Sequence, residues 1–281
     1  MDFRRIEQIF LIVFLCLDIF LFNIFRSGRE GLQMNEGNAE EAIEQRLRKD
    51  DITFDTLSEK QLQGYYLSGE GTNFLDIINK LRNESAPYML NRLDISDSVL
   101  TVYPRQQYFL ENKEDLSGLS SMMDNPEAVV YGKEYEYLKN FSTISEKYQE
   151  IRLGQSYDGI PFIDDTSEID LQLKKSESLL EVTSYTQTHL EEIEPLREKQ
   201  DLCTEREAIV TLYNNSKIPS KSKIAWTQLG YSRILKVREK NVYVPVWFVG
   251  ISSNGNAQQV ERVNAINNTV ITNSTITKVE K

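Results

Sequence analysis

An apolar stretch at residues 6–25 constrains this chain more than any other feature of its sequence. Of its 20 residues, 16 are apolar. A helix of this length spans about 30 Å, which matches the hydrocarbon core of a bilayer. A helix also satisfies its own backbone hydrogen bonds there. The stretch therefore predicts one transmembrane helix, preceded by a tail at residues 1–5 and followed by a long polar body.

A cleaved signal peptide is the alternative interpretation of this stretch. Arg4 and Arg5 supply the charged start that a signal peptide needs. The apolar run is long for a signal peptide, however, and no small-x-small cleavage site follows it, so we expect a retained anchor. A tail this short is expected to stay in the cytoplasm. Charge alone leaves the orientation open, because Arg26 and Arg29 follow the stretch and nearly balance the arginines before it.

Asp18 is the unusual residue within the apolar stretch. An aspartate at the centre of a membrane helix costs about 2.5–3.5 kcal/mol on insertion scales, and such residues usually face a partner helix or a polar cavity. We therefore predict that this face binds another transmembrane helix, from another protein or from a second copy. The alternative is a protonated Asp18 that is tolerated in lipid or reaches the headgroups. Helical spacing places six apolar residues on the same face: Leu11, Phe14, Leu15, Leu21, Phe22 and Phe25.

Composition limits the function classes that are open to the body. The chain has a net charge of −11 and no basic cluster that could neutralise phosphates, so nucleic acid is not an expected partner. The two cysteines are not expected to pair, because Cys16 lies in the predicted anchor and Cys203 in the body. We interpret Cys203 as a small buried residue rather than a reactive thiol.

The chain after the anchor divides into a stalk and two predicted units. Residues 26–49 are a polar stalk that ends in a short helix. The first unit, residues 50–140, has a helical pattern at residues 72–82 and a strand pattern at residues 99–103. Residues 109–123 are expected to be mostly loop with one helical turn.

The second unit, residues 141–281, is dominated by strand patterns. A capping box at residues 204–207 predicts the start of one helix. Three more strands are expected at residues 224–237, 242–251 and 260–271. The order of elements predicts an α+β fold of mainly antiparallel sheets with a few helices, rather than the strict βαβ alternation of nucleotide-binding folds.

The sequence holds no strong signal for catalysis. His189 is the only histidine, so a histidine-based metal cluster is excluded, and we assign His189 a structural or surface role. Phosphate-loop, dinucleotide-binding, nucleophile-elbow and zinc-protease motifs are missing from the sequence. The densest carboxylates, at residues 164–165 and 191–194, match no calcium loop and are interpreted as solvated loops. We therefore predict no catalytic residue, no metal site and no cofactor.

Several short motifs follow one another along nearly the whole chain. They are LD at residues 17–18, GYYLS at 64–68, YDGIPF at 157–162, EAI at 207–209 with LY at 212–213, LGY at 229–231, VPVW at 244–247 and VNAI at 263–266. Each motif is weak alone, but the ordered set resembles the YycI family. Proteins of this family are membrane-anchored regulators associated with YycH and with the WalK (YycG) sensor histidine kinase of low-GC Gram-positive bacteria. The chain departs from the family at Asn267 and Asn268, where a glycine-bearing turn is expected.

The resemblance implies a single-pass protein with a cytoplasmic N-terminus and a two-part, YycH-like body outside the cell membrane. It also implies a non-enzymatic role in a complex with a YycH-like protein and the kinase, partly through transmembrane helices. That complex would tune kinase activity in the control of cell-wall metabolism. Asp18 would then be a polar contact within the helix bundle.

Two other functions stay open at this stage. One is a sensor module outside the cytoplasm that binds a cell-wall or lipid component, which an apolar pocket between the two units would favour. The other is a cell-surface hydrolase, which predicts paired carboxylates at the base of one cleft.

Overall fold

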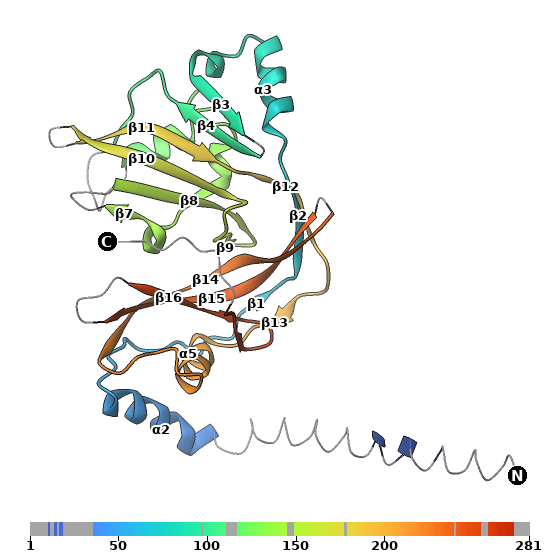
Figure 1. The fold of residues 1–281 in the computed structure, drawn as a ribbon, viewed down its shortest axis with the longest axis vertical. Coiled ribbons are helices and arrows are strands. Elements are labelled where there is room, and N and C mark those ends of the chain that lie inside the picture. Colours follow the sequence, from blue (N-terminus) through green and yellow to red (C-terminus); the bar gives the residue numbers. More distant parts are fainter. Residues whose placement is uncertain are drawn as a thin grey trace, which may run out of the picture. The chain divides into compact units, whose positions relative to one another are not determined.

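The structure is a computed structural model that describes residues 11, 14, 15, 17, 18, 36–96, 98–110, 117–144, 149–176, 179–238, 240–253 and 258–272. It divides into two compact units, Met1–Asp51 and Ile52–Lys281. Figure 1 labels most of their helices and strands. The first unit contains helix α2, Glu36–Lys49, which is the short helix predicted at the end of the stalk. Its last turn carries three basic residues, where cations interact favourably with the helix dipole.

Part of the predicted anchor falls within the described residues. Five of its residues are described, and all are helical with exposed side chains: Leu11, Phe14, Leu15, Leu17 and Asp18. The rest of the predicted partner-binding face lies outside the described residues: Leu21, Phe22 and Phe25. No helix within the described ranges is both long enough and apolar enough to cross a membrane.

The unit Ile52–Lys281 is built on two antiparallel sheets. This confirms the predicted α+β body and shows that it is mostly β. The six-strand sheet has the order β12-β2-β15-β16-β17, and β14 pairs with β15 on its other side. Its strands are β2 (Leu67–Gly71), β12 (Leu190–Pro195), β14 (Ser222–Val237), β15 (Lys240–Ser253), β16 (Gln259–Asn264) and β17 (Thr269–Val270). A separate short pair joins β1 (Gln63–Gly64) to β13 (Gln200–Asp201).

The nine-strand sheet has the order β3-β4-β11-β10-β8-β6, with three short strands paired beside this path. Its strands are β3 (Arg92–Ser96), β4 (Val99–Tyr103), β5 (Phe109–Leu110), β6 (Tyr135–Tyr137), β7 (Thr143–Ile144), β8 (Gln149–Tyr157), β9 (Ile160–Pro161), β10 (Glu168–Ser176) and β11 (Leu179–Gln187). Both sheets take strands from either side of residue 141, and the division predicted at that residue stays a prediction.

The helices of the unit Ile52–Lys281 are short, and two of them begin where a side chain caps them. Asn73 accepts a hydrogen bond from the Leu75 N–H and starts α3, Phe74–Asn83. The predicted capping box is confirmed, because Thr204 and Glu207 exchange bonds at the start of α5, Glu205–Asn214. The other helices are α4 (Ser117–Met123), η1 (Pro87–Leu90), η2 (Gly132–Glu134) and η3 (Lys139–Phe141).

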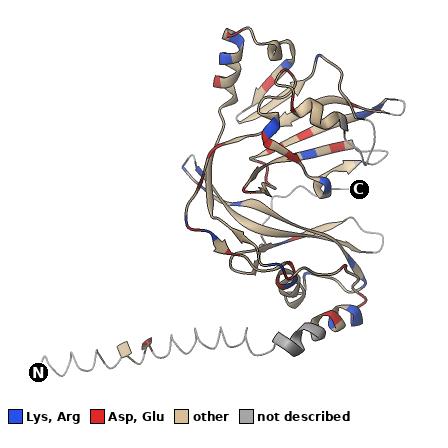
Figure 2. Ribbon diagram, turned by 180° about the vertical axis from the view of Figure 1, so that it is seen from behind, with Lys and Arg blue, Asp and Glu red and all other residues tan. Residues whose placement is uncertain are grey.

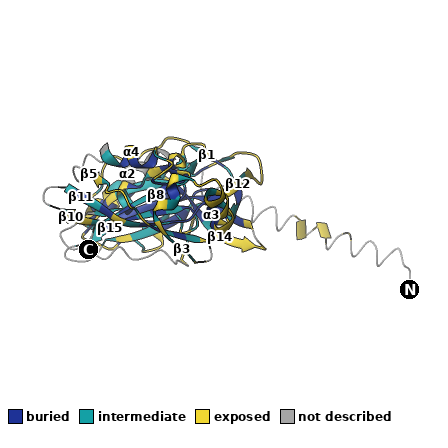
Figure 3. Cartoon of the chain, turned by 90° about the horizontal axis from the view of Figure 1, so that it is seen from above, coloured by how far each residue is buried: buried dark blue, intermediate teal, exposed yellow. Residues whose placement is uncertain are grey.

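The core of the nine-strand sheet follows from side-chain alternation along its central strands. In β8 and β10, the apolar residues Ile151, Leu153, Ile169 and Leu171 are at most 1% exposed. The residues between them are polar and point to the other face of the sheet. In Figure 3, buried residues are concentrated in the strands of this unit. The buried face packs against α3 and α4 through residues such as Phe74, Ile78 and Met122.

Two segments differ from the sequence-based prediction. Residues 109–123 contain the strand β5 and the helix α4, whose polar Ser-rich sequence does not show a helical period. The strand predicted at residues 260–271 is interrupted by a turn that separates β16 from β17. Asn268 has φ 51° in this turn, and asparagine tolerates that left-handed conformation better than most residues. Asn268 thus explains why the expected glycine is not needed here.

Candidate functional site

The chain crosses between the two sheets twice at the same place. One crossing leads from β2 to α3 through Thr72, and the other leads from β11 to β12 through His189. The Thr72 N–H donates to the His189 carbonyl at 2.9 Å. The Thr72 hydroxyl lies 2.6 Å from His189 Nδ1, which joins residues 117 positions apart. These bonds fix the two crossings to each other.

His189 is built into the interior at this crossing. It is 6% exposed, and its Nε2 atom lies 2.9 Å from a carboxylate oxygen of Glu134. Its ring stacks on Tyr131 with 4.5 Å between the ring centroids. Both ring nitrogens of His189 therefore have protein partners, and the residue is buried rather than at the surface.

A pocket with a cavity volume of about 520 Å³ lies at the crossing. Small-molecule sites typically enclose roughly 300–1,000 Å³. The six-strand sheet contributes these lining residues: Glu70, Gly71, Glu191, Arg233, Lys236 and Asn241. The crossing segments and the nine-strand sheet contribute the others: Asn73, Ser98, Val99, Asp165, Thr166, Thr188 and His189.

Most residues that line this pocket have polar side chains, and these include both acidic and basic groups. Val99 is the one apolar side chain larger than a methyl group among the described lining residues. Figure 2 shows the same mixture over both sheets, where Lys and Arg are interspersed with Asp and Glu. A pocket of this size and with this mixture of charged side chains suits a small polar molecule.

The carboxylates that the sequence singled out are placed in different surroundings. Glu191, Glu192 and Glu194 are exposed, as predicted for a solvated segment. Asp164 is not solvated, because its side chain is only 11% exposed. It accepts hydrogen bonds from the Thr166 hydroxyl at 2.8 Å and from the Arg233 N–H at 3.1 Å. Burial, together with the neighbouring Asp165, raises the pKa of Asp164.

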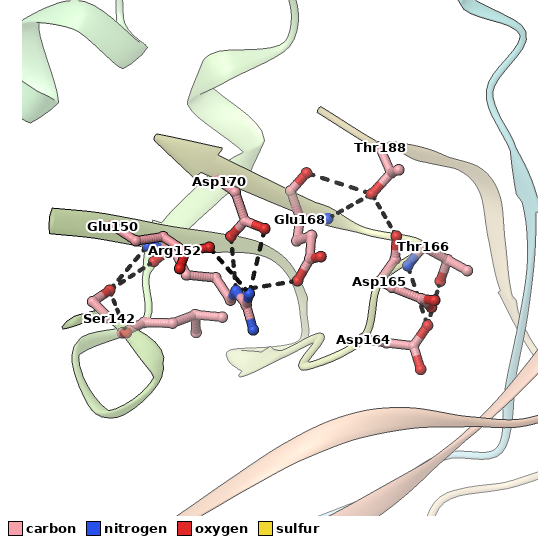
Figure 4. Close-up of polar contacts among 10 residues, drawn as sticks. Ser142, Glu150, Arg152, Asp164, Asp165, Thr166, Glu168, Asp170 and Thr188 are labelled. Carbon is pink, nitrogen blue, oxygen red and sulfur yellow. Dashed lines mark hydrogen bonds and ion pairs between the residues drawn. The ribbon is translucent and has the colours of Figure 1, made fainter. Parts of the chain in front are cut away.

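Figure 4 shows a second charged group, in which three carboxylates surround the guanidinium of Arg152. Arg152 lies directly opposite Asp170 in the β8–β10 register, and its Nε atom is 2.7 Å from an Asp170 oxygen. The same guanidinium is 3.4 Å from Glu168 and 3.5 Å from Glu150. All four side chains project from the polar face of the two strands, since they occupy alternate positions.

The charges in this group do not balance. One guanidinium faces three carboxylates, and the Arg152 side chain is only 12% exposed. Burial raises the pKa of Glu168 to about 8, and the neighbouring Asp170, Asp165 and Asp164 add to the rise while Arg152 opposes it. Glu168 therefore holds a proton in the folded chain under conditions where an exposed glutamate would release it.

Glu168→Gln is expected to remove the part of the fall in unfolding free energy with rising pH that Glu168 causes. The folded state keeps the Glu168 proton up to about pH 8, whereas the unfolded chain releases it near the usual glutamate pKa of 4.5. The native state therefore binds more protons within this window, and stability falls with rising pH by up to about 1.4 kcal/mol per pH unit. Glutamine stays neutral, so the variant should gain on the wild type from about pH 5 to about pH 8, as measured by urea unfolding.

Glu198→Gln is the matched control for this prediction, because Glu198 is exposed. Its unfolding free energy should follow that of the wild type at every pH. Parallel pH profiles for Glu168→Gln and the wild type would show that Glu168 titrates in the folded chain as it does in the unfolded chain.

Groups that could bind a metal or act as a nucleophile are not arranged for either role in the described part of the chain. Within the described parts of the chain, no group of three or more His, Cys, Asp or Glu side chains is placed to hold a metal ion. Burial raises the pKa of the Cys203 thiol to about 12, and Glu207 adds to the rise. The thiolate of Cys203 is therefore scarce at neutral pH. The side chain is only partly buried, however, so the prediction of a buried residue is not fully met.

Sequence reasoning missed Arg152, Arg233 and Asn241. The alternation of charged and apolar residues in β8 and β10 was a usable signal, because it places the charges of both strands on one face. It could not show that this face is covered. Nothing local distinguishes Asn241 from the other asparagines of the chain.

Comparisons with known proteins give the family but little more. The model of the YycI protein family matches residues 32–266, which is most of the chain. No curated protein matches. The solved structure of an uncharacterized protein from Eubacterium rectale matches with a TM-score of 0.47 and 8% identity, over 80% of this chain and 92% of that chain. On the strength of the match over residues 32–266, this chain belongs to the YycI family.

Proposed function

We propose that the chain is a membrane-anchored, non-enzymatic regulator of the WalK (YycG) sensor histidine kinase. The observation that carries this proposal is the match to the YycI family over residues 32–266, since that family consists of regulatory accessory proteins of this two-component system. The regulated process would be cell-wall metabolism, and a YycH-like protein would share the complex.

The apolar stretch at residues 6–25 supports a single membrane crossing in this proposal. Its length and composition suit a bilayer, and five of its residues are helical in the structure. We place the N-terminus in the cytoplasm and the body outside the cell membrane. In this arrangement the body would contact partners outside the membrane while the anchor contacts them within it.

Asp18 is the proposed polar contact between the anchor and a partner helix. A carboxylate within a membrane span is expected to face protein, because exposure to lipid is costly. The neighbouring apolar residues would pack around it: Leu11, Phe14, Leu15, Leu21, Phe22 and Phe25. Polar side chains contribute to helix association within membranes through interhelical hydrogen bonds.

Co-purification from membranes tests this proposal. The intact chain should bring down the kinase and the YycH-like protein. Asp18→Leu, and a chain whose anchor is replaced by an unrelated span, should lose both partners. Asp18→Asn keeps a hydrogen-bonding side chain and should retain part of the binding. Phe20→Leu is the control, because it lies about 200° around the helix from Asp18.

The outcomes separate the two parts of the proposal. Binding that survives both Asp18→Leu and the replaced anchor would move recognition to the body and end the role of Asp18. The absence of the kinase from every preparation, including the wild type, would contradict the regulatory function itself.

A further inference from the structure

We infer that the end of the β14–β15 hairpin docks on the lipid bilayer that holds the predicted anchor. This hairpin end consists of residues 234–238, at the close of β14 and the start of the turn that leads to β15. Its apolar side chains would enter the interfacial region of the bilayer, and its cations would meet anionic headgroups. The inference rests on the proposed single membrane crossing and goes beyond the proposed contacts with the kinase.

The hairpin end exposes three large apolar side chains within four consecutive residues. Ile234 is 46% exposed, Leu235 is 44% exposed and Val237 is 53% exposed. Elsewhere in the described chain, exposed large apolar side chains are isolated along the sequence, except in the predicted anchor, where residues 14–17 include three of them. The hairpin end therefore shares with the anchor a property that suits an apolar environment.

This exposure follows from the position of the segment at the edge of the six-strand sheet. β14 pairs with β15 along its length, and beyond residue 233 it has no second strand partner in the described part of the chain. The register places Leu235 opposite Val242, and a bulge inserts Ile234 as an extra residue. Apolar side chains on an exposed edge are a liability unless another surface covers them. A surface that accepts apolar groups would explain their presence here.

The charges around the hairpin end suit anionic headgroups. Residues 233–240 hold four basic residues and one acidic residue, in a chain whose net charge is −11. Two of the four basic side chains are paired within the body, at 3.1 Å each. The other two, Lys236 and Arg238, have no ion-pair partner among the residues that the structure describes. An anionic surface repels most of this acidic chain and attracts the hairpin end, so it favours this contact over others.

The anchor keeps a bilayer within reach of the hairpin end. The 26 residues between Phe25 and Ile52 include the helix α2, so they span at most about 65 Å. A tethered group meets its surface at a high effective concentration, and a contact that is weak alone is then occupied for much of the time. Three apolar side chains and two cations are therefore enough for docking beside an anchor.

Quenching of tryptophan emission by brominated lipids tests the inference. The full chain is placed in nanodiscs of equal parts phosphatidylglycerol and phosphatidylcholine, with and without bromine on the acyl chains. In Val237→Trp, bromine should remove about half or more of the emission of the added tryptophan, after subtraction of the wild-type signal from Trp226 and Trp247. Leu235→Trp should give the same result and serves if Val237→Trp does not fold. Emission that bromine leaves unchanged in the folded variants would overturn the inference.

Leu90→Trp is the matched control for these variants. Leu90 is 62% exposed, but no neighbour in the sequence is an exposed apolar residue. Its tryptophan should be quenched no more than the two native ones. Equal quenching at positions 90 and 237 would show that lipid contacts the body without preference, and the inference would then be wrong.

Charge reversal tests the contact with headgroups. Lys236→Glu combined with Arg238→Glu should remove most of the quenching in Val237→Trp, because each cation near an anionic surface contributes to binding. Lys221→Glu combined with Lys223→Glu makes the same change in net charge at exposed positions outside the hairpin end, and it should leave the quenching unchanged. Quenching that survives reversal at the hairpin end, or equal losses in both pairs, would overturn the inference.

Failure of this inference can be told apart from failure of the proposed crossing. Co-elution of the chain with nanodiscs in detergent-free buffer reports the anchor, whereas quenching reports the hairpin end. A chain that stays with the discs and shows no quenching keeps the crossing and loses the docking. A chain that does not stay with the discs contradicts both.

Discussion

Phe248→Ala is expected to cost about 3–5 kcal/mol in the free energy of unfolding. Phe248 is fully buried in β15, within an apolar cluster that joins the two sheets. Its ring packs edge to face on Phe141, with 5.5 Å between the ring centroids. The truncation removes this contact and leaves a cavity between two sheets that cannot easily collapse around it. Urea unfolding of the full chain measures the loss.

Phe109→Ala is the matched control for this truncation. Phe109 is 38% exposed in the short strand β5, so the same chemical change should cost about 1 kcal/mol or less. Equal losses in the two variants would show that the contact between the sheets contributes no more than an edge residue does.

Gly154→Ala is expected to destabilise the chain by about 3 kcal/mol, at the upper end of typical overpacking costs. A Cβ atom at Gly154 would overlap the carbonyl oxygen of Phe162 and would lie 3.1 Å from Leu138 Cδ1. The overlapping atom belongs to the backbone, so no rotamer change can relieve the clash. Gly154 also lies within β8, between Glu136 of β6 and Glu168 of β10. A shift of the backbone there would disturb both neighbouring strands.

Gly71→Ala controls for the loss of glycine itself. Gly71 also lies in a strand, but a Cβ atom there would have no neighbour within 4 Å. Its unfolding free energy should stay within about 0.5 kcal/mol of the wild type, or rise slightly because the unfolded chain loses freedom. Thermal unfolding followed by circular dichroism compares the two variants. A loss in Gly71→Ala as large as that in Gly154→Ala would contradict the steric explanation.

Local sequence predicted several elements well because short-range physics decides them. The capping box starts α5 at Glu205, and the predicted strand at residues 99–103 is β4. Both depend on neighbours within a few residues, through an N-cap bond in one case and side-chain alternation in the other. Residues 109–123 were predicted less well, because α4 has too little helical periodicity to be recognised without its tertiary contacts.

The candidate site could not be predicted in the same way. The sequence identified His189 as the only histidine and assigned it a structural or surface role, but it could not name Thr72 or Glu134 as its partners. It also could not place Lys236 opposite Asn241, because that register depends on the bulges within the β14–β15 pair. A shift of one residue would turn these side chains to the other face of the sheet.

The sequence by itself determined the class of the fold, the apolar stretch with Asp18, the capped helix and the absence of familiar catalytic motifs. These properties depend on composition and on spacing along a few turns or strand repeats. The tertiary structure alone decided that β2 pairs with β12 and β15, that the crossings at Thr72 and His189 meet, and that a polar pocket lies beside them. The physical reason is that each of these contacts joins residues far apart in the chain, so its energy depends on how the whole body packs.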